Sequence, residues 1–157
     1  MERCAKMCGI AGYKFIEKDE NLFQNNINQI LNSLKNRGPD FQDYWHNQKK
    51  NCFLLNTRLK IQDLNNRANM PMLSVCKKFV ITYNGELYNK KFLIEKYLKN
   101  VRLETNSDTE VILQLYIIYD NQFLSFVDGM YSIAIYDSNK DILFLARYPL
   151  GIKPLYY

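Results

Sequence analysis

Met7-Cys8-Gly9-Ile10-Ala11-Gly12 is the stretch around which the rest of the chain can be arranged. It opens a strand-like segment in which two glycines permit close approach of another backbone. If the residues up to Met7 are removed, Cys8 carries a thiol and a free α-amine, which are a nucleophile and a base on one residue. A small buried hydrophobe is the commoner role of a cysteine. The remaining motifs must decide between these two interpretations.

The composition indicates one globular domain. The chain has 157 residues, of which 47% are apolar and 14% aromatic, and this suffices for a core. Its apolar runs are shorter than the ~18–20 residues that cross a bilayer, and residues 1–7 lead into no secretory segment. We therefore expect a cytoplasmic protein without a membrane partner. The net charge of +5 comes from scattered lysines, which predicts a solvated surface and no nucleic-acid partner.

Cysteine and histidine usage limits the chemistry. The four cysteines form no CxxC pair, and His46 is the only histidine, so neither a metal site nor disulfides are expected. A Cys–His dyad would have to use His46, which nothing in the sequence places near Cys8. An α-amine has a reference pKa of about 7.7–8.0 and a thiol of about 8.5. An N-terminal cysteine would therefore bring its own base.

The hydrophobic pattern predicts an α+β fold. Residues 8–16 are typical of a strand, and a helix of about four turns follows, from an N-cap at Asn21, with Phe23 on its apolar face, to Gly38-Pro39. We interpret Arg37-Gly38-Pro39-Asp40 as the turn that ends it. Further strands are expected over 41–46, 52–59, 78–83, 131–137 and 141–147, and further helices around 92–98 and after Ser107. Strands grouped apart from helices favour an α+β sandwich.

Three other segments carry structural expectations. The loop over 60–77 is long enough to suggest a function. The strands over 131–137 and 141–147 are almost continuously apolar, as expected for strands covered on both faces. Residues 153–157 are apolar and aromatic, which is typical of a strand cut off within a larger protein.

Several side chains could serve acyl chemistry. Asn84-Gly85 offers an amide and an unshielded backbone N–H as oxyanion donors, although Asn-Gly is also a strong hairpin-turn signal. Arg58 could hold a carboxylate bidentately, or could be an edge-strand arginine in water. Asp108, in the capping-box pattern Ser107-Asp108-Thr109-Glu110, and Glu86 could accept an ammonium group. An acid in a first helical turn is also favoured by the helix dipole alone.

Seven motifs occur together in one order: MCGIAG (7–12), RGPD (37–40), TRL (57–59), NGELYN (84–89), SDTEVI (107–112), GMYSIAIYD (129–137) and LGIKPLYY (150–157). Over residues 7–157 the chain resembles the glutaminase domain of glutamine-hydrolysing asparagine synthetase. That domain is a class II glutamine amidotransferase with the N-terminal-nucleophile fold. The resemblance implies a four-layer αββα sandwich of two antiparallel sheets. It also implies that residues 1–7 are a removed leader or a misassigned start. Residues 8–157 would be an amidotransferase domain incomplete at its C-terminus, with the synthetase domain absent.

The resemblance also implies roles for individual residues. Cys8 would attack the carboxamide of glutamine, and Asn84 and Gly85 would form the oxyanion hole. Arg58 would hold the α-carboxylate, and Asp108, assisted by Glu86, the α-ammonium. The segment after Arg58 would supply further substrate contacts: Leu59, Lys60, Ile61 and Gln62. Ammonia would pass to a synthetase domain or subunit that uses ATP and Mg to amidate aspartate. The glutaminase domain itself would hold no cofactor or metal, and a homodimer is possible.

Two alternatives stay open. The chain could be a catalytically silent module that keeps the fold for binding or docking, because Cys8 is not N-terminal or because the domain is truncated. It could also be a Cys–His hydrolase that uses His46.

Overall fold

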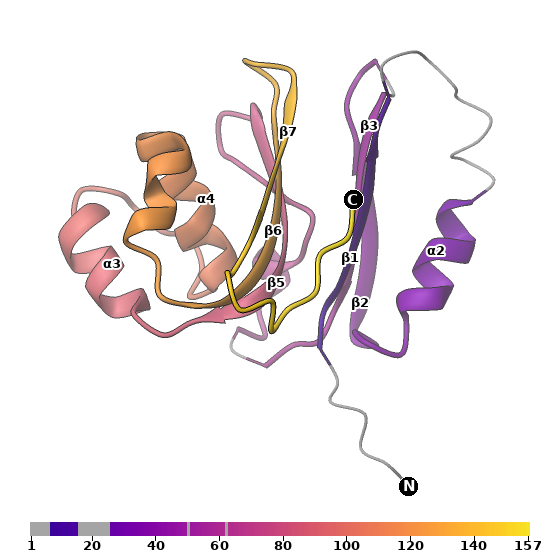
Figure 1. Cartoon of the computed structure of the whole chain (residues 1–157), viewed down its shortest axis with the longest axis horizontal. Coiled ribbons are helices and arrows are strands. Elements are labelled where there is room, and N and C mark those ends of the chain that lie inside the picture. Colours follow the sequence, from indigo (N-terminus) through magenta and orange to yellow (C-terminus); the bar gives the residue numbers. More distant parts are fainter. Residues whose placement is uncertain (1–6, 16–25, 50, 62) are drawn as a thin grey trace, which may run out of the picture.

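The computed structural model describes residues 7–15, 26–49, 51–61 and 63–157. Within these residues, two antiparallel sheets face each other and helices cover both outer faces (Figure 1). The first sheet has the order β1-β3-β2, with β1 Gly9–Lys14, β2 Phe41–His46 and β3 Cys52–Arg58. The second has the order β4-β5-β6-β7, with β4 Met72–Leu73, β5 Phe79–Leu87, β6 Gly129–Asp137 and β7 Ile142–Arg147.

The helices complete the four layers. Helix α2 (Ile27–Leu34) packs on the first sheet, and α3 (Lys90–Tyr97) and α4 (Asp108–Tyr119) pack on the second (Figure 1). Two short 3-10 helices, η1 (Asn66–Ala68) and η2 (Asp120–Ser125), lie in the connections. The predicted α+β sandwich of two antiparallel sheets is confirmed.

Strand β3 shows why the sheets stack. All seven of its residues are buried, and alternate side chains point to opposite faces. Phe53 and Leu55 pack against α2, whereas Cys52 and Leu54 join the core between the sheets. The inter-sheet layer also holds a polar bridge, because Thr82 Oγ1 donates to the Leu55 carbonyl at 3.2 Å. The two sheets are therefore fixed relative to each other.

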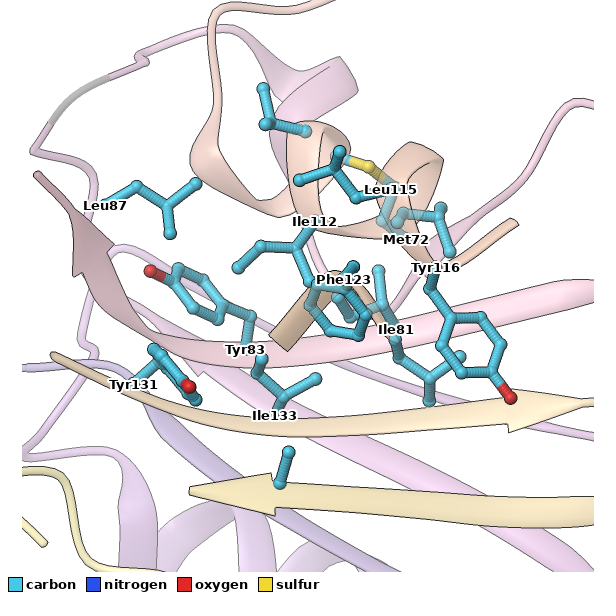
Figure 2. Packing of buried hydrophobic residues seen from close by; sticks show 14 of the residues in the cluster. Met72, Ile81, Tyr83, Leu87, Ile112, Leu115, Tyr116, Phe123, Tyr131 and Ile133 are labelled. Atoms are coloured by element: carbon cyan, nitrogen blue, oxygen red, sulfur yellow. The ribbon is translucent and has the colours of Figure 1, made fainter. Parts of the chain in front are cut away.

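The largest core lies between the second sheet and its helices (Figure 2). Ile81 and Ile133 on the strands meet Ile112 and Leu115 of α4, and Phe123 of η2 closes the cluster. Helix α4 begins as predicted, because the side chain of Ser107 accepts the backbone N–H of Glu110 at 3.2 Å. This core fixes the start of α4 against β5.

The prediction of a turn at Asn84-Gly85 is wrong. Strand β5 continues to Leu87, and Asn84 and Gly85 pair with Ser132 and Tyr131 of β6. The nine-residue β6 supplies a ladder partner along the whole of β5, and this long-range pairing outweighs the local Asn-Gly preference. The chain instead leaves the sheet after Leu87 and enters α3 at Lys90.

Three other expectations need correction or fall outside the description. Strand β6 is buried almost throughout, but β7 is an edge strand with exposed positions, so it is not covered on both faces. Residues 153–157 form no strand. The predicted helix start, with Asn21 and Phe23, lies outside the described residues, and the helix ends at Leu34. No described helix has both the length and the apolar character needed to cross a membrane.

Candidate active site

A pocket of about 370 Å³ opens where the end of β3, the start of β1, β5 and the N-terminus of α4 meet. Its volume lies within the range of small-molecule sites. Most of the predicted site residues line it: Cys8, Arg58, Leu59, Ile61, Asn84, Gly85, Glu86 and Asp108. The fold therefore gathers residues that are up to a hundred positions apart in the sequence into one cavity.

Cys8 lies immediately before β1, at the pocket wall. The glycine after it allows this, because a Cβ on Gly9 would lie 2.5 Å from Thr57 Oγ1 of β3. The backbone N–H of Leu59 donates to Cys8 Sγ at 3.5 Å, and Arg37 Nε donates to the Cys8 carbonyl at 3.3 Å. Cys8 is thus held on both sides by neighbouring segments.

Burial outweighs the neighbouring positive charges at the Cys8 thiol, so the pKa of this thiol is raised. Burial raises the pKa of the thiol, because it disfavours the thiolate. The Leu59 N–H and three cations, Arg58, Lys153 and Arg37, act in the opposite direction and lower this pKa. Three cations therefore surround Cys8, although burial keeps the thiol form favoured in the chain with Met7 attached.

The segment Arg37 to Asp40 does more than end a helix. A Cβ on Gly38 would lie 2.2 Å from the Thr57 carbonyl oxygen, so the turn packs directly on β3. The Asp40 N–H donates to the Arg58 carbonyl at 3.1 Å, and Asp40 Oδ2 accepts the Lys60 N–H at 2.8 Å. This turn fixes the end of β3. The sequence identified the segment as a motif and a helix-ending turn, but it did not predict this contact with β3.

Arg58 is buried in the pocket wall. Its side chain is not solvated at a strand edge, because only 5% of the residue is exposed. The guanidinium donates to Asn69 Oδ1 at 2.6 Å, to the Asn65 carbonyl at 3.2 Å and to the Asp63 carbonyl. The loop that follows β3 is therefore folded around this arginine.

Asn84 and Gly85 present two hydrogen-bond donors to the pocket. The Asn84 side chain is buried and makes no hydrogen bond within the part of the chain that the structure describes. The Leu87 N–H points away from β6, since it donates to Asp108 Oδ2 at 2.9 Å. Because N–H directions repeat every second residue along a strand, the Gly85 N–H faces the same free edge. The arrangement can stabilise negative charge on a substrate oxygen.

Asp108 is shared between α4 and β5. Its buried carboxylate accepts the Leu87 N–H through Oδ2, while Oδ1 lies 3.0 Å from Lys90 Nζ. Lys90 also donates to the Asn106 carbonyl at 2.9 Å. Sequence reasoning missed Lys90, because nothing in the chain order predicts that the first residue of α3 reaches the first residue of α4. Glu86 is exposed and lies at the pocket wall.

Some predicted residues do not reach the site. Lys60 is not part of the pocket wall, and its Nζ donates to Asn66 Oδ1 at 2.9 Å. Gln62 lies outside the described residues. His46 pairs with Phe53, five residues along β3 from Arg58, which corresponds to about 16 Å. This separation excludes a Cys8–His46 dyad.

Two further pocket residues, Tyr83 and Lys153, had no role predicted from the sequence, although Lys153 lies within the motif over 150–157. The hydroxyl of Tyr83 is buried without a hydrogen-bond partner, and burial, with Asp108 as the next cause, raises its pKa well above the usual range. Lys153 is buried at the pocket wall. Among the described residues, no three His, Cys, Asp or Glu side chains are grouped to hold a metal.

The Cys8 thiol lies just before the first strand of a two-sheet sandwich. It shares a pocket with the amide donors of Asn84 and Gly85 and with buried Arg58 and Asp108. This combination is that of an N-terminal-nucleophile hydrolase domain. The chain belongs to the glutamine amidotransferase domain family, whose model matches residues 7–157.

Curated relatives agree with this assignment. The chain is 36% identical over 150 residues to asparagine synthetase B (glutamine-hydrolysing) of Escherichia coli, with 96% of this chain and 26% of that protein covered. It is 36% identical over 152 residues to a probable glutamine-hydrolysing asparagine synthetase of Schizosaccharomyces pombe, with the same coverage. A Methanocaldococcus jannaschii counterpart, described as putative in its own name, is 35% identical over 167 residues, with 96% and 32% covered. The chain therefore spans about a quarter to a third of these relatives.

Proposed function

We propose that this domain hydrolyses L-glutamine to glutamate and ammonia, with Cys8 as the nucleophile. One observation carries the proposal: Cys8, Arg58, Asn84, Gly85 and Asp108 converge on one pocket of about 370 Å³. They supply a nucleophile, a cation, two oxyanion donors and an anion, which are the groups needed to bind and cleave an amino acid with a side-chain amide.

Substrate binding uses the two buried charges. The Arg58 guanidinium binds the α-carboxylate, and the Asp108 carboxylate binds the α-ammonium with help from Glu86. Leu59 and Ile61 contribute contacts beside Arg58. This orientation directs the substrate carboxamide toward Cys8 and Asn84.

The chemistry proceeds in two steps. The Cys8 α-amine takes the thiol proton, and the sulfur attacks the carboxamide carbon. Asn84 Nδ2–H and the Gly85 N–H stabilise the oxyanion, and the intermediate collapses to a thioester as ammonia leaves with the proton from the α-ammonium. Water then gives a proton to the amine and attacks the thioester, which releases glutamate and restores the thiol.

The mechanism requires a free amine on Cys8. In the chain as given, the Cys8 nitrogen is in a peptide bond to Met7, and an amide nitrogen is no base. We therefore propose that residues 1–7 are removed, or that translation starts at Met7 and Met7 is then cleaved.

The fate of the ammonia is inferred from the relatives. Because they are named as glutamine-hydrolysing asparagine synthetases, we propose that the ammonia passes to a synthetase domain or subunit, which amidates aspartate with ATP and Mg. That partner lies outside this chain. A homodimer, a cytoplasmic location and the lack of a cofactor in this domain stay predictions.

A second candidate is a silent glutamine-binding or docking module. It is favoured by one contact, since Met7 lines the pocket and its Sδ lies 2.7 Å from Lys153 Nζ. In that form Cys8 has no amine. The module binds glutamine through Arg58 and Asp108 without turning it over.

Turnover by two forms of the protein separates the candidates. Glutamate and ammonia are measured from L-glutamine for the full chain and for a form that begins at Cys8, verified by intact mass. We expect equal amounts of both products from the Cys8 form and none from its Cys8→Ala variant. Cys76→Ala, which changes an exposed thiol, keeps full activity. A folded Cys8 form that binds glutamine without releasing glutamate supports the silent module instead.

A further inference from the structure

Lys153 is a buried ammonium without an oxygen partner in the part of the chain that the structure describes. Only 6% of the residue is exposed, and it lines the pocket that holds Cys8. Its Nζ donates to Met7 Sδ at 2.7 Å, but a thioether is a weak acceptor. No described carboxylate lies within ion-pair distance of it. Burying a cation without such a partner is costly, so the position of Lys153 calls for an explanation beyond packing.

The backbone fixes Lys153 in this position. Ser132 Oγ donates to the Lys153 carbonyl at 2.6 Å, and Ser132 is the residue of β6 that pairs with Asn84. The chain turns into this segment at Gly151, whose φ of +68° suits glycine. The second sheet thus holds the lysine beside the proposed oxyanion donors.

Other charged and titratable groups face Cys8 from several elements, and each has a different environment. Arg37, after α2, uses its Nε for the Cys8 carbonyl, and Arg58 of β3 is bonded to the following loop. Glu86 and Tyr83 of β5 add one exposed acid and one buried phenol. Two more acids line the pocket, Asp63 in the loop after β3 and Asp108 at the start of α4, where Asp108 is paired with Lys90. Among the described residues, Lys153 is the one of these three cations whose side chain has no oxygen acceptor at all. Its ammonium is therefore free to act on the sulfur without an oxygen acceptor holding it elsewhere.

We propose that Lys153 is a positioning residue whose ammonium stabilises the thiolate of Cys8 and, once Met7 is removed, keeps the freed α-amine unprotonated. Removal of Met7 takes away the only hydrogen-bond acceptor that the Lys153 ammonium has among the described residues. The same cleavage converts the neighbouring Cys8 nitrogen into an amine, and a nearby cation disfavours protonation of that amine. This second role rests on the proposed glutaminase function, whereas the first does not.

The field of Lys153 acts on both groups of the nucleophile in one direction. A cation favours the thiolate and disfavours the ammonium, so it lowers the pKa of the thiol and that of the α-amine. Lys153 is one of the charges that lower the pKa of the Cys8 thiol. The pKa of Lys153 itself is lowered, mainly by burial and next by the charge of Arg37. Glu86 and Cys8 act in the opposite direction and raise it.

The first role is tested on the full chain without glutamine. The rate of Cys8 alkylation by iodoacetamide is followed against pH by peptide mass spectrometry. In Lys153→Met, the midpoint, which is the pH at which the alkylation rate reaches half of its maximum, moves up by about one unit. This is the shift expected from the loss of one nearby charge in a partly buried site. Lys91→Met, which removes an exposed lysine paired only with Glu95, leaves the midpoint unchanged. Lys153→Arg keeps it near the wild-type value.

An unchanged midpoint in folded Lys153→Met overturns the first role, and Lys153→Gln replaces that variant if it does not fold.

The second role is tested on the form that begins at Cys8, through the acidic limb of kcat/KM against pH. We expect this limb to move up by about one unit in Lys153→Met while the melting temperature is unchanged. A limb that does not move overturns the second role. Complete lack of turnover in the wild type contradicts the proposed function and leaves the alkylation result to decide the first role.

Discussion

Lys90 Nζ lies 3.0 Å from Asp108 Oδ1, so the carboxylate proposed to bind the substrate ammonium already carries a cation. The Lys90 side chain is 30% exposed and that of Asp108 only 3%. An incoming ammonium must therefore compete with a half-solvated lysine that can move toward water.

We predict that Lys90→Met lowers KM for L-glutamine. The competing ion pair is partly solvated and is worth about 0.2–1 kcal/mol, so the decrease is roughly 1.4- to fivefold with little change in kcat. Steady-state kinetics of the form that begins at Cys8 measure this. Lys91→Met serves as the control, and a higher KM in Lys90→Met shows that Lys90 orients Asp108 without competing.

Asn84 gives a prediction about kcat. Its side chain has no partner among the described residues and faces the pocket, so its loss removes an oxyanion donor and disturbs little else. Asn84→Ala lowers kcat by about 10²–10³ while KM changes little. Asn139→Ala, in the exposed β6–β7 turn, is the matched control. Loss of substrate binding with kcat retained would assign Asn84 to binding instead.

The contact of Gly38 with β3 predicts a loss of stability. A Cβ at this position would lie 2.2 Å from the Thr57 carbonyl oxygen and 2.5 Å from the Arg58 nitrogen, and backbone atoms cannot yield as a side chain does. Gly38→Ala therefore lowers the free energy of unfolding by about 1–3 kcal/mol and weakens glutamine binding through Arg58. Urea denaturation measures the first effect. Unchanged stability would show that the turn is only a helix stop.

Cys52 makes stability depend on alkaline pH. Burial, the main cause, raises the pKa of this thiol from 9.0 to about 12. The folded state thus favours the protonated thiol, so its contribution is complete below pH 9 and is lost as the pH rises from 9 toward 12. Within this window the loss approaches about 1.4 kcal/mol per pH unit.

The comparison with Cys52→Ala isolates this contribution. The variant is less stable at neutral pH because it leaves a small cavity, but its unfolding free energy falls less steeply above pH 9. Other groups titrate in the same range, so the difference between the two slopes is the quantity to measure. Parallel slopes would mean that Cys52 is not the group responsible.

The layers of the fold were predictable from local pattern. Alternating or continuous apolar residues identified β2, β3 and β6 to within two residues, because sheet strands impose a period on the sequence. The course of β5 through Asn84-Gly85 was not predictable, because it depends on pairing with β6, some fifty residues away. Local turn preference cannot register such a partner.

The site residues also divide into those that the sequence could predict and those that it could not. Cys8, Arg58 and Asp108 could be proposed because their residue types and neighbouring motifs suit acyl chemistry. Lys90 and Lys153 could not, since a lysine is ordinarily a solvated surface residue and only the folded chain shows where each one lies. The contact between Lys153 and Met7 spans 146 positions, and no local pattern encodes it.

The covalent intermediate tests the central claim most directly. The form that begins at Cys8 is mixed with L-glutamine, quenched in acid during turnover and digested for mass spectrometry. The mechanism predicts a glutamyl group on the peptide that contains Cys8, absent when the thiol is replaced in Cys8→Ala and absent from the full chain that retains Met7. Glutamate release without modification of Cys8, or a glutamyl group on Cys52 or Cys76, would contradict the assignment of Cys8 as the nucleophile.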